Sequence, residues 1–405
     1  MRIENAKQNI EVILSWFSEA FSSPSFKFFC AYVIGFIQLG KEAHTSSTVQ
    51  SLIQSTWRRS LASFTRFLAS YVWDQDQLVR TAVEHFFRTL KIKTGSVLFL
   101  LVDDTLAQKT GKKIAGCGWH KDHAHQLANV FGHQWVLSAL LYKDFLFPLW
   151  AKLYHPKGSK GCGRFQTKVA MVKKILRQLH LPIPCKVYLL ADAWYWSKDL
   201  AQACRQQGYH MISQLKSNAT LLVDGKSVRV KLLADQKMGY REFSLSLYGK
   251  NKTLKIKKVL GEKKDFGKVA MVIVKEHKKK PYFLISTKSY LPALDVVRYY
   301  AKRWKIEQLI KDLKQRLGFG DYQARSLQAI VRHAALSLMA YFVLTILKIF
   351  QWFIDKQKAL NLSIRLWAFQ VRQFVLIELI TVTLKIMKIS FKQNILDSYL
   401  EQLYI

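Results

Sequence analysis

The sequence predicts an α/β protein in which a helical N-terminal region precedes a core of strands and helices. Residues 1–92 carry apolar side chains at helical spacing, for example at Phe64 and Leu68. From Gly95 the apolar residues instead form short continuous runs that are typical of buried strands, and helical spacing returns at Thr167. The chain of 405 residues is long enough for two or three domains.

The predicted core elements follow one another in a defined order. We expect three strands at 96–102, 130–142 and 145–154, a helix from Thr167, a strand at 186–191, a helix after Ser197 and a strand at 209–215. Three strands followed by a helix and a further strand is the order of a ribonuclease H-like fold.

A segment after the last of these strands is longer than the remaining core elements require. Within it, an Asp224-Gly225 pair and the alternating run 241–247 are typical of β-hairpins, so we expect an inserted β domain. The predicted organisation is a helical domain at 1–92, a core at 93–216 and 282–345, an inserted β domain at 217–281 and a helical C-terminal segment at 346–405.

Two of the predicted strands deliver aspartates to a sheet edge. Asp103 and Asp104 follow the apolar run 96–102, and Asp192 follows the run 186–191. Side chains at strand ends are held by a rigid scaffold and still reach solvent, so ligands commonly bind there.

A later segment places four functional groups on one face of a predicted helix. Tyr300, Arg303, Glu307 and Lys314 stand at offsets 0, 3, 7 and 14, and at about 100° per residue they share an arc of roughly 60°. Such a stripe can be a solvated helix face. It can also be a metal-binding carboxylate among groups that hold a nucleic-acid phosphate.

Two strand-end acids followed by a helical glutamate resemble the DDE transposases of bacterial insertion sequences. The helix matches the Tyr-x2-Arg-x3-Glu-x6-Lys signature of that family at every defined position. The segments 103–111, 135–141 and 318–326 are also similar to blocks of these enzymes, so the resemblance spans roughly residues 20 to 345. It independently implies a ribonuclease H-like catalytic core.

The resemblance implies that three carboxylates act as catalytic acids and bind two Mg²⁺ ions, for which Mn²⁺ would substitute. We assign these roles to Asp104, Asp192 and Glu307. Asp104 is preferred to Asp103 because the acid directly before the threonine aligns with the family's position. On the same helix, the groups expected to contact DNA are Tyr300, Arg303, Lys311 and Lys314.

The implied activity is DNA transposition by phosphodiester cleavage and strand transfer. The enzyme would nick the ends of its insertion sequence by hydrolysis and then join the freed 3′ ends to target DNA. Its expected partner is double-stranded DNA, bound by a homodimer in the cytoplasm at the bacterial nucleoid. The alternatives are a related or domesticated DNA-binding nuclease of the same fold without transposition activity, and a non-catalytic basic DNA-binding protein.

The charge of the chain agrees with a nucleic-acid partner. Sixty-three Lys and Arg against 27 Asp and Glu give a net charge of +36, a field that attracts polyanions. The helical N-terminal domain resembles a DNA-binding domain, in which Arg58, Arg59 and Arg66 would face DNA, although a solvated helix face fits them equally well. Lysine-rich stretches at 250–258 and 275–280 are also expected to meet phosphate.

Two apolar segments raise the alternative of a membrane protein. Residues 28–40 and 334–347 are both shorter than the roughly 20 apolar residues that a spanning helix needs, so we expect buried helices and no membrane partner. A tilted helix that continues to Ile354 is the remaining alternative. Five scattered cysteines indicate a reducing compartment, and the polar first ten residues do not resemble a signal peptide.

Two further clusters are weighed against plain structural roles. Cys117, His120, His123 and His125 have spacings that a zinc site uses, but they lie in a predicted loop without a second matching pair. Beside Asp192, one ring of the Trp194-Tyr195-Trp196 run could stack on an extruded base, although packing under the sheet is the commoner outcome.

Overall fold

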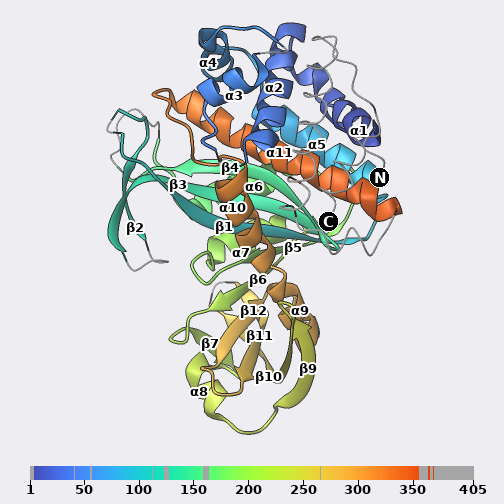
Figure 1. Cartoon of the computed structure of the whole chain (residues 1–405). Helices are drawn as coiled ribbons and strands as arrows, with labels where there is room; N and C mark the ends of the chain where they lie inside the picture. Colours follow the sequence, from blue (N-terminus) through green and yellow to red (C-terminus); the bar gives the residue numbers. More distant parts are fainter. Residues whose placement is uncertain are drawn as a thin grey trace.

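The structure is a computed structural model of the chain (Figure 1). Helices α1 to α5 and α11 form one end of the molecule, a mixed sheet fills the middle, and a β-rich part with α8 and α9 forms the other end. The residues described are 4–40, 42–54, 57–111, 113–122, 127–157, 164–264, 266–354, 364 and 368.

The N-terminal part is helical, as predicted, in the residues that the structure describes. Its elements are α1 (Glu4–Ser15), the 3₁₀ turn η1 (Ser18–Ala20), α2 (Ser23–Leu39), α3 (Ser46–Ile53), α4 (Leu61–Ala69) and α5 (Gln75–Thr89). Side-chain oxygens cap two of the helix starts, since Thr45 accepts from the N–H of Thr48 and Ser60 accepts from the N–H of Ser63.

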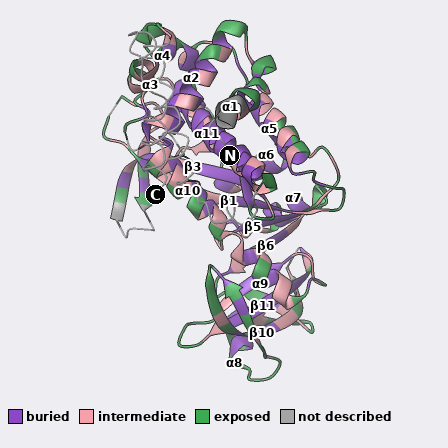
Figure 2. Cartoon of the chain, turned by 45° about the vertical axis from the view of Figure 1, so that its right-hand side comes forward, coloured by how far each residue is buried: buried purple, intermediate pink, exposed green. Residues whose placement is uncertain are grey.

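The long helix α11 (Leu327–Ile354) joins these helices to the sheet. It packs against α1, α2, α4 and α5 on one side and against β4 on the other. Its Arg332 is 5% exposed and donates to the carbonyls of Leu68 and Trp73, at 3.2 and 3.0 Å. The helical part and the core therefore share one hydrophobic interior, which is buried in Figure 2.

The burial of helix α11 argues against the alternative of a membrane-spanning helix. By length and composition it is able to cross a membrane, but 89% of its apolar window is buried inside the protein, as in the core helix of a soluble protein. The prediction of a buried helix at 334–347 is confirmed. The helix runs unbroken through residues 345 and 346, where the predicted C-terminal segment begins, and most of that segment lies outside the described residues.

The predicted order of core elements is confirmed. The elements are β1 (Val97–Gln108), β3 (Leu127–Tyr142), β4 (Phe145–Tyr154), α6 (Lys168–Gln178), β5 (Lys186–Ala191), α7 (Lys198–Gln206) and β6 (His210–Leu215). Strand β3 pairs antiparallel with β1 and β4, whereas β1, β5 and β6 are parallel. This is a mixed sheet. Asp192 directly follows the end of β5, as predicted, whereas β1 continues through Asp103 and Asp104 to Gln108, so the strand end predicted before these two acids is wrong.

A segment of the core that was predicted as a loop is a strand. The segment around Cys117 and His120, expected as a loop, contains the strand β2 (Gly118–Asp122), which pairs antiparallel with the N-terminal half of β3. The long β3 provides the reason, because its residues 127–132 extend beyond β4 and leave an edge for β2 to pair with.

The hairpins predicted after β6 are present. Asp224 and Gly225 form a two-residue turn with φ of 49° and 74°, which suits the twist of a hairpin. The elements are β7 (Thr220–Val223), β8 (Lys226–Arg229), α8 (Val230–Asp235), β9 (Arg241–Leu247), β10 (Lys250–Lys263), β11 (Gly267–Glu276) and β12 (Tyr282–Ser286). These strands continue the core sheet, because β12 pairs antiparallel with β6.

The helix that carries the signature residues is interrupted. Helix α9 (Ala293–Ala301) ends before Lys302, and α10 (Trp304–Arg316) begins after Arg303. Between them the N–H groups of Arg303 and Ile306 bond to carbonyls three residues earlier, the pattern of a 3₁₀ turn. The interruption does not separate the signature residues, because the Arg303 guanidinium lies 6.0 Å from the Tyr300 ring centroid and also contacts Glu307.

The segment after α10 is fixed to the N-terminal helices by a buried histidine. His44 is 1% exposed, and its Nδ1 and backbone N–H both lie 3.1 Å from Asp321 Oδ2. Nearby Gly318 has a φ of +66°, and a Cβ added there would collide with the His44 side chain.

We expect Gly318→Ala to destabilise the protein more than Gly208→Ala. Gly208 has a similar φ of +71°, but nothing lies within 4 Å of an added Cβ. The left-handed backbone costs an alanine about 1 kcal/mol at either position, and the collision with His44 should add about 1–3 kcal/mol at Gly318. Urea unfolding of both variants measures the difference. Equal losses would show that His44 moves away freely.

Candidate active site

The two aspartates of β1 serve different faces of the sheet. Successive side chains of a strand point in opposite directions. Asp103 faces α10, where its Oδ2 lies 2.8 Å from the guanidinium of Arg303. Asp104 faces α6, where its Oδ2 lies 2.6 Å from Lys168 Nζ. The two neighbouring acids therefore belong to two separate clusters.

The first cluster joins Asp103 to Glu307 through a single arginine. Arg303 donates from one terminal nitrogen to Asp103 and from the other to Glu307 Oε1, at 2.5 Å. The second oxygen of Asp103, Oδ1, accepts the N–H of Asp104 at 2.9 Å. Glu307 stands in the first turn of α10, so one helix start and one strand hold the three charged groups together.

The electrostatics of Asp103 reflect its burial. Removal from water raises the pKa of this carboxyl to about 6, an effect that the Arg303 charge opposes. The charges of Asp192 and Asp104 raise the pKa further. Strand register also brings the end of β5 near this cluster, because Leu101 pairs with Leu190 and the two acids each follow two residues later.

The second cluster surrounds Asp104. Its Oδ2 accepts from Gln134 at 2.7 Å as well as from Lys168, and its Oδ1 accepts from the hydroxyl of Tyr195 at 3.4 Å. Tyr195 is fully buried, and burial together with the three nearby aspartates raises the pKa of its phenol well above the ordinary value. Nothing in the sequence indicated Lys168 or Gln134, since both come from elements remote from Asp104 in the chain.

Asp192 follows β5 directly and is held by its own turn. Its Oδ1 accepts the N–H groups of Trp194 and Tyr195 at 2.9 and 3.3 Å. Its backbone carbonyl accepts the hydroxyl of Ser213, from the adjacent β6, at 2.7 Å. The turn fixes the carboxylate at the sheet edge between the two clusters.

The donor chemistry around Asp103 suits a hard divalent cation. Carboxylate oxygens are the ligands that Mg²⁺ prefers in proteins. Asp103 and Glu307 already share a cationic group, Arg303, which stands where two acids converge. As the side chains lie, no three His, Cys, Asp or Glu in the described part of the chain form a group that could hold a metal ion. A metal ion between Asp103 and Glu307 would compete with the Arg303 charge for these carboxylates.

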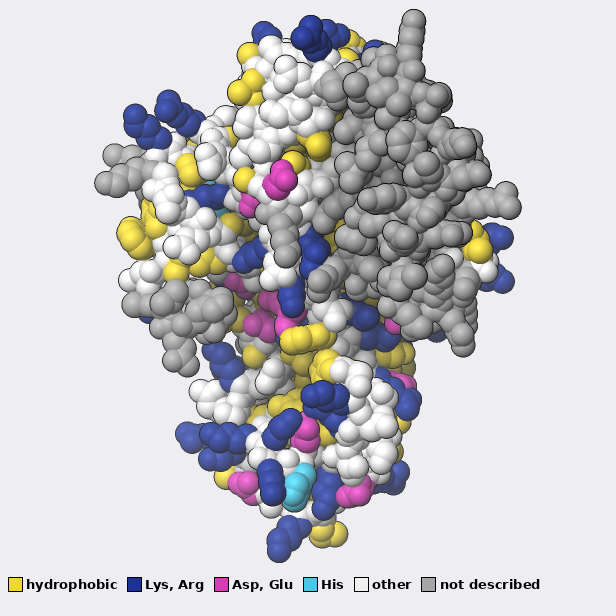
Figure 3. Space-filling model, viewed as in Figure 1, with side chains coloured by type: hydrophobic (Ala, Val, Ile, Leu, Met, Phe, Trp, Pro, Cys, Tyr) yellow, Lys and Arg dark blue, Asp and Glu magenta, His cyan; other side chains and the backbone are white. Residues whose placement is uncertain are grey.

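Figure 3 shows the side chains on one face of the molecule, coloured by type. Acidic side chains gather near the centre of the face, at the level where the upper body meets the β-rich part, with lysines and arginines around them. An exposed aromatic pair stands next to the first cluster. Tyr248, in the β9–β10 turn, contacts Trp304 edge to face, with 6.1 Å between the ring centroids.

The other signature residues occupy different environments. Tyr300 is 8% exposed, and its hydroxyl lies 3.4 Å from Gln214 Oε1. Lys314 donates to the backbone carbonyl of Leu106 on β1 at 2.6 Å, so it braces α10 against the sheet. Lys311 is exposed on α10. Of the predicted DNA contacts on this helix, Lys311 is thus the most accessible.

The predicted arginines of the helical part are exposed. Arg58 and Arg59 precede α4, and Arg66 lies on that helix, where it bonds to the Ala62 carbonyl at 3.3 Å. The lysines of β10 differ from one another, because Lys250 and Lys255 are exposed whereas Lys257 is buried against Gln236.

The tryptophan run after Asp192 is divided between packing and exposure. Tyr195 is buried under the sheet, as the commoner outcome predicts. Trp194 is 57% exposed, and the Lys168 ammonium lies 5.0 Å from its ring centroid. An accessible indole therefore lies beside the second cluster.

The zinc hypothesis gains no support from the described residues. Cys117 Sγ lies 3.4 Å from His133 Nε2, a histidine that the hypothesis did not include. His123 and His125 lie outside the described residues. Among the described cysteines the structure shows no disulfide.

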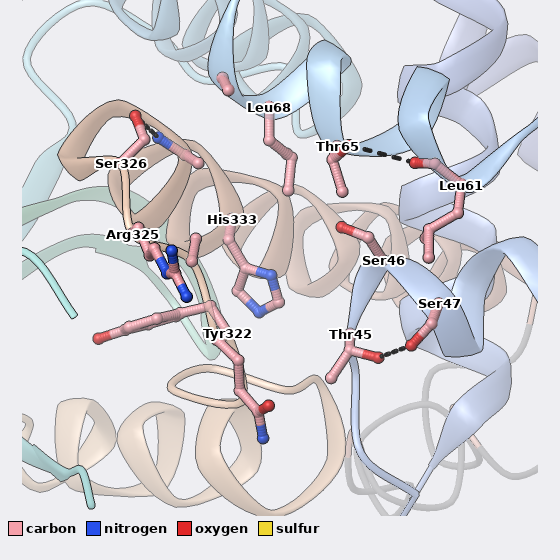
Figure 4. A pocket seen from close by; sticks show the side chains of 14 residues that line it. Thr45, Ser46, Ser47, Leu61, Thr65, Leu68, Tyr322, Arg325, Ser326 and His333 are labelled. Carbon is pink, nitrogen blue, oxygen red and sulfur yellow. Dashed lines mark hydrogen bonds between the residues drawn. The ribbon is translucent and has the colours of Figure 1, made fainter. Parts of the chain in front are cut away.

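A pocket of about 400 Å³ lies apart from the acids, between α3, α4, residues 322–326 and the start of α11 (Figure 4). Hydroxyl groups of Ser46 and Thr65, the Arg325 guanidinium and the buried His333 line it. Burial lowers the pKa of His333 to about 4, so this imidazole is neutral at pH 7. No carboxylate lines the pocket, which separates it from the candidate active site.

Comparison with known families identifies the core. The family described as "Transposase DDE domain" matches residues 99–343, more than half of the chain, and this range contains both acid clusters. No curated protein matches the chain closely enough to count as a relative.

We expect Lys168→Met to lower the free energy of unfolding by roughly 2–3 kcal/mol, because it leaves the largely buried Asp104 without its cation. Urea unfolding measures the change. Lys174→Met, at an exposed position of the same helix, is the matched control and should cost less than about 0.5 kcal/mol. Equal losses in the two variants would mean that Gln134 and Tyr195 alone satisfy Asp104.

Proposed function

From the premise that this chain belongs to the transposase DDE-domain family, we propose that it binds the ends of an insertion sequence, cleaves phosphodiester bonds there and joins the 3′ ends to target DNA. The observation that carries the proposal is the convergence of Asp103 and Glu307 on Arg303, with Asp192 close enough to affect the pKa of Asp103. These acids come from β1, α10 and the end of β5, and all lie within the matched range.

We assign the first catalytic acid to Asp103, which revises the sequence-based choice of Asp104. The physical reason is the alternation of β1, which directs Asp103 toward Glu307 and Asp104 toward Lys168. The proposed triad is therefore Asp103, Asp192 and Glu307. In this assignment Asp104 is a positioning residue that links β1 to β3 through Gln134 and to the turn after β5 through Tyr195.

DDE transposases generally use divalent metal ions, and the proposed triad is the donor set that would hold them here. When bound, Mg²⁺ or Mn²⁺ supplies activation of the attacking water or 3′-hydroxyl and stabilisation of the leaving oxygen. The chain's own residues fix the geometry. The Trp194 and Tyr195 amides orient Asp192, and α10 fixes Glu307 opposite β1.

DNA contacts are proposed on the exposed cations around the acids. Lys311 on α10 and Lys250 and Lys255 on β10 reach solvent and can neutralise phosphates. We also propose that Arg303, Tyr300 and Lys314 contact the DNA beside the acids. A second copy of the chain would complete a homodimer on the two element ends, in the cytoplasm.

The acids are tested by isosteric substitution. We expect Asp103→Asn, Asp192→Asn and Glu307→Gln each to reduce strand cleavage by at least about a hundredfold, because each removes a metal-binding charge with little change of volume. Cleavage of a supercoiled plasmid that carries the element ends, with Mg²⁺, is the measurement. DNA binding, followed by gel shift, should change little.

Asp104→Asn is the internal control for the assignment. It removes the charge of the adjacent residue and should leave most of the cleavage activity. Cleavage that survives Asp103→Asn but is lost in Asp104→Asn would restore the sequence-based choice. Full cleavage activity in all four variants would show that the reaction does not use these carboxylates, and no cleavage by the wild type would favour a DNA-binding protein without catalysis.

The proposed DNA contact of the helical part is tested by its salt dependence. Replacing Arg58, Arg59 and Arg66 with alanine should reduce the slope of log K against log salt by about 0.9 for each phosphate that the variant no longer neutralises. Arg88→Ala is the matched control, since Arg88 is exposed and lies in the last turn of α5. An unchanged slope in the triple variant would show that these three arginines do not contact DNA phosphates.

A further inference from the structure

Arg303 occupies the position between two acids that a bridging cation would take. Its guanidinium is a rigid fork, and the two terminal nitrogens reach Asp103 Oδ2 at 2.8 Å and Glu307 Oε1 at 2.5 Å. The Arg303 side chain is only 18% exposed, so these contacts form largely away from water. The arginine thus neutralises the acids from inside the protein.

Each oxygen of Asp103 accepts a hydrogen bond. Oδ2 accepts from Arg303, and Oδ1 accepts the backbone N–H of Asp104. The second contact is made by the backbone of the neighbouring residue. A metal ion beside Asp103 and Glu307 would instead compete electrostatically with the Arg303 guanidinium, which belongs to a side chain with several rotatable bonds.

We propose that Arg303 is a latch that closes the metal site in the DNA-free protein and opens when its guanidinium moves to a DNA phosphate. The inference rests on the proposed function. A phosphate offers the same fork two oxygens, as a carboxylate does, so it can replace the acids as the partner of Arg303. The exchange needs only a side-chain rotation at the turn between α9 and α10.

The latch makes metal binding and DNA binding mutually dependent. A metal ion in the DNA-free protein has to compete with Arg303 for the two carboxylates. With DNA present, the displaced arginine gains a phosphate. By linkage, DNA must then tighten metal binding and metal must tighten DNA binding by the same factor. The acids would be loaded with metal chiefly when DNA is in place.

A static brace is the competing interpretation of the same contacts. In that case Arg303 only fastens the start of α10 to β1, and its loss lowers stability without exposing a metal site. The two interpretations differ in the effect of DNA on metal binding. Loss of the Arg303 charge favours a bound cation in both, but only the latch predicts that DNA tightens metal binding by the wild type much more than by Arg303→Gln.

The test is a Mn²⁺ titration of the full-length protein, with free Mn²⁺ followed by electron paramagnetic resonance. Without DNA, we expect Arg303→Gln to bind Mn²⁺ about tenfold more tightly than the wild type. A short mixed-sequence DNA duplex at low salt should tighten Mn²⁺ binding of the wild type by a similar factor and that of the variant much less. Thermal unfolding of each protein confirms that it is folded.

Three further variants locate the effect. Lys302→Gln removes a neighbouring cation whose ammonium lies over the Phe99 ring, 5.4 Å from its centroid, and it should leave Mn²⁺ binding unchanged. Arg303→Lys keeps the charge but loses the fork, so its affinity should fall between those of the wild type and Arg303→Gln. Adding Asp103→Asn to Arg303→Gln should abolish the increase in Mn²⁺ affinity.

Three other outcomes would overturn the latch, and one of them would overturn the proposed function as well. If Arg303→Gln binds Mn²⁺ no more tightly than the wild type while Asp103→Asn still abolishes cleavage, the latch is wrong and the proposed function stands. If the gain survives Asp103→Asn, the ion binds elsewhere and the latch is wrong. If no protein binds Mn²⁺ with or without DNA and none cleaves DNA, both proposals are wrong.

Discussion

The alternation of side chains along β1 is the constraint on which the candidate site depends. The strand is apolar and buried through Val102, with β3 on one side and β5 on the other. A slip of one residue would turn every core side chain to the wrong face, so the register is fixed. The Asp103 side chain therefore points toward α10, and the Asp104 side chain points toward α6. Two adjacent acids become members of two ion-pair clusters, each with its own cation.

The burial of the two carboxylates explains why each cluster contains a buried cation. The chain as a whole has a net charge of +36. Burial disfavours an isolated carboxylate, as the raised pKa of Asp103 shows. Arg303 and Lys168 offset that cost for Asp103 and Asp104 at short range. The remaining cations lie largely at the surface, where they act on a polyanion at a distance. The same residue types thus have two physical roles that composition alone does not separate.

The sequence predicted the elements whose signal is local. Apolar runs that end in acids placed Asp192 at a strand end, and the Asp224-Gly225 pair placed a hairpin turn. It could not predict features set by distant partners. Choosing between Asp103 and Asp104 needs the position of α10, which contacts β1 from 200 residues away along the chain. The break before α10 has no Pro or Gly to signal it, and β2 forms only because β3 extends beyond β4.

The continuity of the sheet determines how the β-rich part can serve the acids. Strand β12 pairs with β6, the neighbour of β5, so the sheet passes without a linker from the Asp192 strand into the hairpins. The Tyr248–Trp304 contact joins the β9–β10 turn to the start of α10 at a second point. Two attachments fix the direction of β10 relative to Glu307. DNA bound along the exposed lysines of β10, as proposed, would therefore approach the acids at an angle set by strand pairing, and a flexible tether could not provide that constraint.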